Sequence, residues 1–157
     1  MILFKTPAKY TDGQKFELMK FVYDNTDSFI MNTFGWLWET RKWWGIQHID
    51  LIDNEKGEIM ALHAYSVNVT PGILKTYYIV TAKSQRGKGL AKALTFHSLR
   101  KHQAVCTDYY VNSEENSDGV AFYKKLFNSW SNKPNEFGTL DFIFKQPINE
   151  ILNEQTL

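Results

Sequence analysis

The stretch that decides the fold is QRGKGLA, residues Gln85–Ala91. An aromatic and β-branched run before it predicts a strand over Ile73–Thr81, and the run after it predicts a helix over Leu90–His102. Gly87 and Gly89 have no Cβ and so permit the close approach of a ligand. The first N–H groups of a helix lack intrahelical partners and carry positive partial charge. A strand, a glycine turn and a helix start therefore predict a phosphate-binding loop.

Three known phosphate loops can be compared with this stretch. A Walker A loop needs Ser or Thr directly after Gly-Lys, and position 89 is Gly89. A Rossmann loop needs a third small residue where Lys92 stands, and it opens the first strand–helix unit rather than lying in mid-chain. The third pattern, Arg-x-x-Gly-x-Gly/Ala, is satisfied by Arg86, Gly89 and Ala91. It resembles the coenzyme A loop of the GNAT family of N-acetyltransferases.

A second motif in Asn116–Leu126 strengthens the resemblance. GNAT proteins typically carry an Asn near the start of the fourth helix and a Tyr seven residues later, which correspond to Asn116 and Tyr123. The resemblance implies an α/β (α+β) fold with a mixed central sheet, helices on both faces and the order β-α-α-β-β-β-α-β-α-β, with one further strand left open. We expect a single domain over residues 1–147 and a fraying polar tail over 148–157.

Periodicity and turn residues give the remaining elements. We expect a first helix over 12–25, capped at Thr11 and Asp12, and a second over 29–44 with an unusually wide aromatic arc. The other elements are expected as follows: strands Ile2–Lys5, Ile46–Asp53, Glu58–Val67, Thr107–Asn112 and Thr139–Lys145, and a helix Asn116–Phe127.

Composition limits the classes of partner. The formal net charge of +1 argues against a protein that binds nucleic acid mainly through its phosphates. The single cysteine, Cys106, cannot form an intrachain disulfide, and we expect it to be a small buried hydrophobe. We find no signal peptide and no apolar run long enough to span a bilayer. These features predict a cytoplasmic protein without membrane contact, and they leave a homodimer open.

The resemblance implies which residues bind acetyl-CoA. The end of the predicted strand would pair with the pantetheine arm, the loop amides would bind the pyrophosphate, basic side chains would add charge, and Asn116 would contact pantetheine or the next loop. Asn116 suits a helix N-cap equally well. The implied donor-site residues are Ile79, Val80, Thr81, Arg86, Gly87, Lys88, Gly89, Leu90, Ala91, Lys92 and Asn116. No metal is implied.

Tyr123 is the catalytic residue that the resemblance implies. In the family this Tyr lies near the thioester sulfur, where a neutral phenol can protonate the departing thiolate. The alternative is an aromatic packing residue beside Phe122. No general base is evident, because Val111 stands where some members have Glu. The candidates, acting through a water, are His63, Asp108 and Glu115.

The expected function is acetyl-CoA-dependent N-acetylation of a primary amine by direct attack. The acceptor is a peptide or a small molecule, and the few acids around the predicted cleft mildly disfavour polyamines. The alternative is a catalytically silent protein of the same fold that acts as a coenzyme A-binding or protein-interaction module. The missing base and the aromatic arc of 29–44 motivate that alternative.

Overall fold

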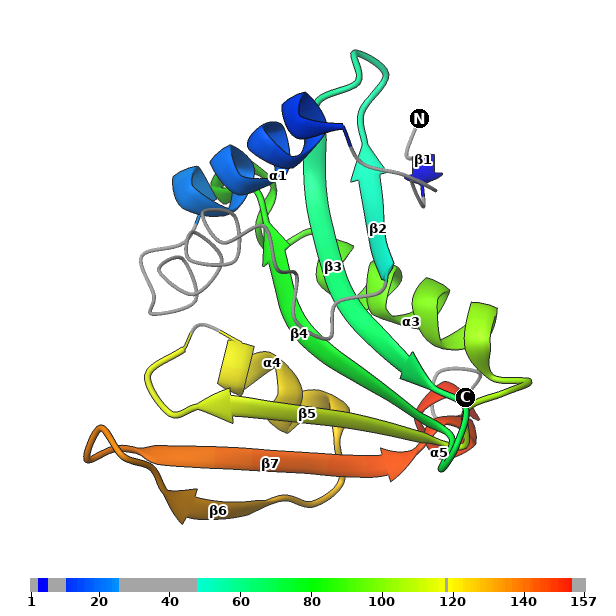
Figure 1. Cartoon of the computed structure of the whole chain (residues 1–157), viewed down its shortest axis with the longest axis vertical. Helices are drawn as coiled ribbons and strands as arrows, with labels where there is room; N and C mark the ends of the chain where they lie inside the picture. The colour runs from blue at the N-terminus through cyan, green and yellow to red at the C-terminus, as the bar shows by residue number, and fades with distance from the viewer. Residues whose placement is uncertain (1–2, 6–10, 26–47, 118, 154–157) are drawn as a thin grey trace.

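A computed structural model describes residues 3–5, 11–25, 48–117 and 119–153. Within them, a seven-stranded mixed sheet has the order β1-β2-β3-β4-β5-β7-β6 (Figure 1). The strands are Leu3–Lys5 (β1), His48–Asp53 (β2), Ile59–Asn68 (β3), Ile73–Thr81 (β4), Asp108–Glu114 (β5), Ser131–Pro134 (β6) and Leu140–Pro147 (β7). The helices are Asp12–Asn25 (α1), Leu90–His102 (α3), Gly119–Leu126 (α4) and Ile148–Asn153 (α5).

One pair of neighbouring strands is parallel, and it shapes the whole sheet. β4 and β5, which α3 connects, pair only from Ile73–Thr76 to Asp108–Val111. Beyond that segment β4 continues to Thr81 and β5 to Glu114, and the two diverge (Figure 1). The other strand pairs are antiparallel. The sheet therefore opens between β4 and β5 at their C-terminal ends.

Helices α1 and α3 cover opposite faces of the β2–β4 part of the sheet (Figure 1). α1 begins with reciprocal caps: the Thr11 N–H donates to Gln14 Oε1 at 2.9 Å, and the Gln14 N–H donates to Thr11 Oγ1 at 3.2 Å. The predicted cap at Thr11 is confirmed. Apolar side chains bury α1 against one face: Leu18, Phe21, Val22, Ile49, Leu51, Leu62, Ala64, Tyr78 and Val80. On the other face, Ile52 and Ala61 of the sheet form a cluster with Leu90 and Leu94 at the start of α3.

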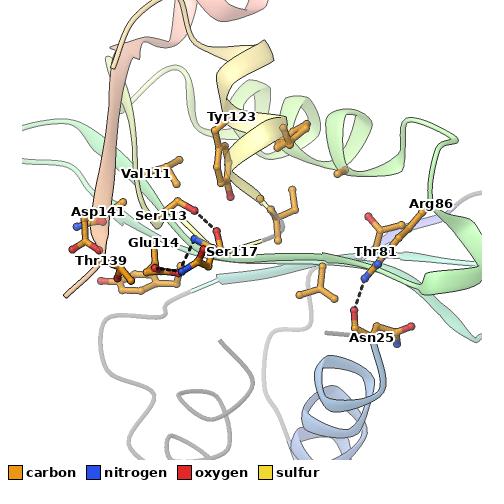
Figure 2. Close-up of a pocket in the computed structure, with 18 of the residues that line it drawn as sticks. Asn25, Thr81, Arg86, Val111, Ser113, Glu114, Ser117, Tyr123, Thr139 and Asp141 are labelled. Atoms are coloured by element: carbon orange, nitrogen blue, oxygen red, sulfur yellow. Dashed lines mark hydrogen bonds between the residues drawn. The ribbon is translucent and has the colours of Figure 1, made fainter. Parts of the chain in front are cut away.

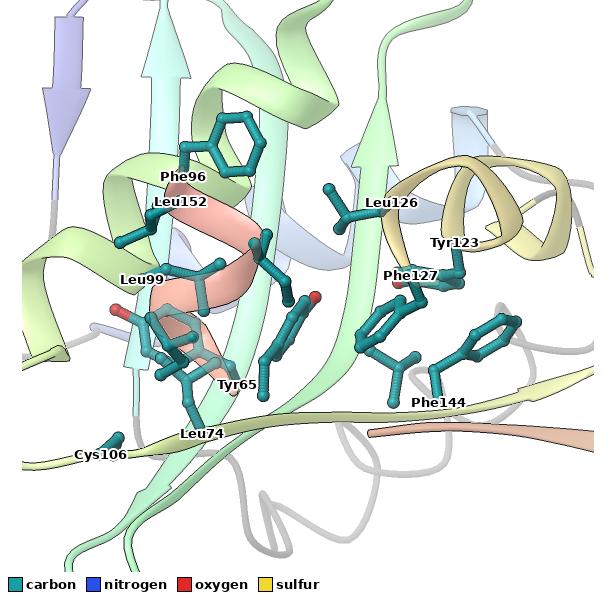
Figure 3. Close-up of a cluster of buried hydrophobic side chains, with 14 residues drawn as sticks. Tyr65, Leu74, Phe96, Leu99, Cys106, Tyr123, Leu126, Phe127, Phe144 and Leu152 are labelled. Atoms are coloured by element: carbon teal, nitrogen blue, oxygen red, sulfur yellow. The ribbon is translucent and has the colours of Figure 1, made fainter. Parts of the chain in front are cut away.

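The largest buried cluster joins α3, α4 and α5 to β5 and β7 (Figure 3). It is rich in aromatic rings, and Phe127 lies 5.3 Å from Tyr109 and 5.2 Å from Phe144, centroid to centroid. Offset and tilted ring pairs of this kind add to the energy of area burial. Cys106 is also buried here, as expected, and burial raises the pKa of its thiol.

The sequence predicted most elements closely. The strand over Ile73–Thr81 and the helix over Leu90–His102 agree with the structure at both ends. Helix α4 begins at Gly119 rather than at Asn116, because Glu115 and Asn116 lie in a turn. The predicted helix over 29–44 lies outside the described residues.

The C-terminal segment differs from the expected fraying tail. Residues Ile148–Asn153 form α5, and Ile148, Ile151 and Leu152 are buried in the main aromatic cluster. The local sequence is polar at the intervening positions, so only the contacts with α3 and β7 show that this turn of helix belongs to the core. Among the described helices, none has the length and apolar composition that crossing a bilayer requires.

The burial of Ile151 gives a stability prediction. Ile151→Ala should lower the free energy of unfolding by about 2–4 kcal/mol, because the deletion leaves a cavity in a side-chain site that is 0% exposed. Exposed Glu150→Ala, on the same helix, should change it by less than about 0.5 kcal/mol. Urea unfolding measures both. Equal, small effects would mean that α5 does not contribute to the core.

Candidate functional site

The main cavity, of about 910 Å³, lies where β4 and β5 diverge. β4 contributes Tyr77, Ile79, Val80 and Thr81 to its lining, β5 contributes residues 111–114, and α4 closes it with Phe122 and Tyr123. Figure 2 shows Arg86 and Thr81 at one end of the cavity and Thr139 and Asp141 at the other, with Tyr123 between them. A ligand in this cavity could therefore contact the glycine loop and the chain around Asp141 together.

A second cavity of about 420 Å³ adjoins the first at the glycine loop. The two cavities share Thr81, Arg86, Ala91 and Phe122. The loop glycines adopt left-handed backbone angles, with φ of +80° at Gly87 and +75° at Gly89, and a Cβ at either would meet nothing within 4 Å. The open space above this backbone is what a phosphate cradle needs.

Gly89 is also the N-cap of α3, and it makes no side-chain capping bond. The Ala93 N–H, at 3.0 Å from the Gly89 carbonyl oxygen, is the first amide of the helix that finds an intrahelical acceptor. The amides before it, at Leu90, Ala91 and Lys92, are therefore available to a ligand. Their partial charge favours an anion in the second cavity.

The basic side chains of the loop have different surroundings. Lys92 lines the second cavity, and so does Lys125 of α4, which the sequence analysis did not select. Arg86 donates instead to the carbonyl oxygen of Asn25 at 2.6 Å, at the end of α1 (Figure 2). Lys88 donates to Gln85 Oε1 at 2.9 Å and lines neither cavity. In this structure Arg86 lines both cavities and also anchors the loop to α1, while Lys92 and Lys125 face the second cavity.

Asn116 lines the main cavity but does not cap α4. Its backbone N–H donates to Glu114 Oε2 at 2.9 Å and its side-chain Nδ2 donates to Glu114 Oε1 at 3.2 Å. The N-cap interpretation is therefore wrong, because the helix begins at Gly119. Asn116 fixes the carboxylate of Glu114 in the turn between β5 and α4.

Tyr123 is 4% exposed, and its ring lies among Phe122, Phe127 and Phe144. Burial, and then the neighbouring Tyr109, raise the pKa of its hydroxyl well above the ordinary value, so it stays a neutral donor. Among the described residues no side-chain hydrogen bond to this hydroxyl is recorded, and Figure 2 shows it directed into the main cavity. Tyr123 is thus both a packing residue and a donor aimed at the cavity.

Gly119 is explained by its contact with Tyr123. A Cβ at Gly119 would lie 3.0 Å from the Cε2 atom of the Tyr123 ring, one helical turn away. That distance is too short without movement of the ring. The glycine therefore leaves room for Tyr123 at the cavity, which accounts for a weak helix former at the first position of α4.

The fold can now be compared with solved structures. A protein assigned to the GNAT acetyltransferases from Desulfovibrio desulfuricans superimposes with a TM-score of 0.73 at 12% identity, covering 94% of this chain and 99% of its own. A mutant spermidine N-acetyltransferase from Vibrio cholerae gives 0.69 at 13% identity and 98% of each chain. The ribosomal-protein alanine N-acetyltransferase from Escherichia coli gives 0.64 at 14% identity, covering 93% of this chain and 94% of its own.

The chain has the GNAT fold. No protein-family model and no curated protein matches the sequence. The fold class expected from the sequence motifs is confirmed by the structural similarity, which extends over nearly the whole chain.

Two of the three candidate general bases, Asp108 and Glu115, do not line the main cavity. Asp108 pairs with Ile73 and Pro147, at the end of β5 remote from the cavity. Glu115 accepts the Leu140 N–H at 3.0 Å and does not line the cavity.

His63 is also excluded as a base, because it is fully buried under α3. Its Nδ1 lies 2.9 Å from Ser98 Oγ, and its Nε2 lies 2.7 Å from Thr76 Oγ1. Burial lowers the pKa of its imidazole to about 3. The residue is a neutral core histidine with both ring nitrogens occupied.

Among the described residues, the carboxylates that line the main cavity are Glu114 and Asp141. They are directly opposite one another in the β5–β7 pairing. The sequence analysis missed both, since Glu114 follows the predicted end of its strand and the register that brings Asp141 beside it is set by tertiary pairing. Among the described residues, no cluster of His, Cys, Asp and Glu is arranged to hold a metal ion.

The state of His63 predicts how stability depends on pH. The pKa of a His is about 6.5 when unfolded and about 3 here, so between these values the unfolded chain binds more protons. Stability from this group is complete above pH 6.5 and is lost as the pH falls, by about 1.4 kcal/mol per pH unit. In urea titrations from pH 7 to pH 4, His63→Gln should show a shallower loss than the parent chain. Parallel curves would contradict the prediction.

Proposed function

We propose that this protein is an N-acetyltransferase that uses acetyl-CoA as donor and a primary amine as acceptor. The observation that carries the proposal is the pair of joined cavities, which links the open glycine loop to the cavity-facing hydroxyl of Tyr123. The structural neighbours named as acetyltransferases support the same activity class.

The donor end of the site suits an extended molecule with phosphate at one end. The free amides at the start of α3, together with Lys92 and Lys125, provide donors and positive charge for a pyrophosphate. From there Ile79, Val80 and Thr81 continue along the edge of β4 where β5 has left it. An edge strand offers backbone groups to an extended partner, as the amide-containing pantetheine arm requires.

The reaction proposed is a direct transfer. The neutral amine nitrogen forms a bond to the thioester carbonyl carbon, and the carbon–sulfur bond breaks. The amine loses a proton to solvent, and the thiolate takes a proton from the Tyr123 hydroxyl, which is then reprotonated from solvent. Most of the rate gain would come from holding two substrates in one orientation. The Cys106 thiol is buried away from the cavity lining, in keeping with transfer without a covalent intermediate.

A non-catalytic coenzyme A-binding or protein-interaction role is the competing function. It was motivated by the missing base, and Glu114 and Asp141 now provide carboxylates at the cavity. Thiol release measured with acetyl-CoA and a panel of amines separates the two functions. Tight donor binding without release on any amine would favour the binding role, and absent donor binding would reject both.

A cytoplasmic location is part of the proposal, since the lone thiol of Cys106 suits a reducing compartment.

Gly89→Glu tests the donor site. The new side chain would enter the open space over the loop and repel the pyrophosphate, so acetyl-CoA affinity measured by calorimetry should fall at least about 100-fold. Gly57→Glu is the matched control, because Gly57 also has a φ of +80° and nothing within 4 Å of a built Cβ, in a turn that lines neither cavity. Both variants carry the same backbone strain. Equal affinity in the two would show that the loop does not bind the donor.

Tyr123→Phe tests the proposed acid. The ring and its packing are kept, and the hydroxyl, which has no side-chain partner among the described residues, is removed. We expect kcat to fall about 10²–10³-fold, within the range for a positioned acid, with acetyl-CoA affinity changed less than about threefold. Steady-state kinetics and calorimetry measure both. An unchanged kcat across pH would make Tyr123 a packing residue alone.

A further inference from the structure

Two carboxylates occupy the end of the main cavity farthest from the glycine loop. Glu114 and Asp141 are register partners across β5 and β7, and Figure 2 shows both side chains at this end. Directly opposite residues of an antiparallel pair have Cβ atoms about 4.5–5.5 Å apart, so two like charges here repel one another. Such an arrangement is relieved by a cation between the two groups.

Neutral donors hold these carboxylates without cancelling their charge. Glu114 accepts the two hydrogen bonds from Asn116, and Asp141 Oδ1 accepts one from Asn135 Nδ2 at 3.0 Å. Lys133 is the register partner of Asp141 on β6. Within the part of the chain that the structure describes, no ion pair to Glu114 or Asp141 is recorded. The pair is oriented by amides, and its two carboxylates outnumber the one lysine in register with them, which leaves a net negative charge for a ligand.

A second and independent feature of the same cavity points to a ligand. Only 4% of Tyr123 is exposed. Its hydroxyl points into the cavity, and no hydrogen bond joins it to another side chain of the described residues. The hydroxyl faces the cavity, so a ligand or water there can complete its hydrogen bonds. Tyr123 therefore marks where the reacting group lies, between the loop and the two carboxylates.

We propose that the acceptor is a small amine that carries a second ammonium group, and that Glu114 and Asp141 bind this second group. The inference rests on the proposed acyl transfer and names its substrate class. The reacting amine faces the Tyr123 end of the cavity, while the second ammonium lies between the carboxylates. The spacer between the nitrogens runs over the apolar lining of Tyr77 and Val111.

This substrate class reverses an expectation from the sequence. Few acids were expected around the acceptor end, because the first two predicted helices and the last strands are aromatic and carry few carboxylates. Glu114 and Asp141 become a site only when β7 pairs with β5. The charge that selects the acceptor is therefore created by strand pairing.

The test compares two acceptors of equal length, 1,4-diaminobutane and 4-aminobutan-1-ol, which differ in the second ammonium. With acetyl-CoA saturating, kcat/KM should be at least about tenfold higher for the diamine. Glu114→Gln and Asp141→Asn should each reduce this preference several-fold, and the double variant should abolish it, because the isosteric amides remove the charge. Asp141→Asn keeps its acceptor for Asn135, while Glu114→Gln keeps one of the two acceptors for Asn116. The diamine KM should also rise with salt, while that of the amino alcohol stays level.

Glu136→Gln is the matched control. Glu136 is exposed in the neighbouring β6–β7 turn and does not line the cavity. The substitution therefore removes one nearby negative charge without changing the site. The preference for the diamine should be unchanged in this variant. Calorimetry of acetyl-CoA and thermal unfolding should match the parent chain in all variants, which separates a lost acceptor contact from a lost fold.

The outcomes separate this inference from the proposed function. Equal turnover of the two amines, or a diamine preference that survives in the double variant, overturns the inference and leaves the transferase. Turnover confined to the N-terminal amine of a lysine-containing peptide overturns the small-amine acceptor. If no amine is turned over, the proposed function fails. Calorimetry of 1,4-diaminobutane on the acetyl-CoA-saturated protein then tests the cation site by itself. Binding that the double variant loses supports the cation site, and absent binding overturns it.

Discussion

The pairing of β4 with β5 ends at Thr76 and Val111, and the main cavity of the candidate site opens where it ends. The Thr76 hydroxyl lies at this point, 2.7 Å from His63 Nε2 on β3 and 2.6 Å from the Tyr109 hydroxyl on β5. One buried side chain thus joins three strands at the position where two of them separate. Breaking either hydrogen bond would leave a buried polar group without a partner, so the separation point is strongly specified.

The same hydrogen-bonded chain continues to a buried charge. Asp50 is 0% exposed and binds Lys101 at 2.6 Å, while Ser98 donates to its second oxygen at 2.7 Å. Because Ser98 donates to Asp50, the pattern that satisfies each group has His63 donating to Ser98 and accepting from Thr76. The polar groups are aligned toward one carboxylate, and the low pKa of His63 keeps the imidazole neutral within the chain. This network shapes the sheet and does not face the cavity.

The site that results has two ends of different origin. The donor end is local, since Gly87, Gly89 and the start of α3 are consecutive in sequence and need only the strand before them. The opposite end is assembled from β5 and β7, where Glu114 meets Asp141. Between the ends, Tyr123 reaches the cavity from α4 because Gly119 leaves space for its ring. Donor and acceptor chemistry are thus determined by different kinds of contact.

The sequence by itself determined the local parts: the strand Ile73–Thr81, the helix Leu90–His102, the loop between them and the resemblance that predicted the GNAT fold. These follow from short-range periodicity and from glycine's freedom to adopt positive φ. The sequence also singled out Tyr123, whose contacts in the structure allow the predicted role. It misassigned the segment from Ile148, whose helix exists through packing.

Tertiary structure alone decided the features that depend on long-range pairing. Only the burial of His63 against Ser98 and Thr76 removed it from the candidate bases. Only the β5–β7 register brought Glu114 and Asp141 together at the cavity. A residue's charge and reactivity are set by which distant groups surround it, and strand pairing and helix packing bring those groups to it.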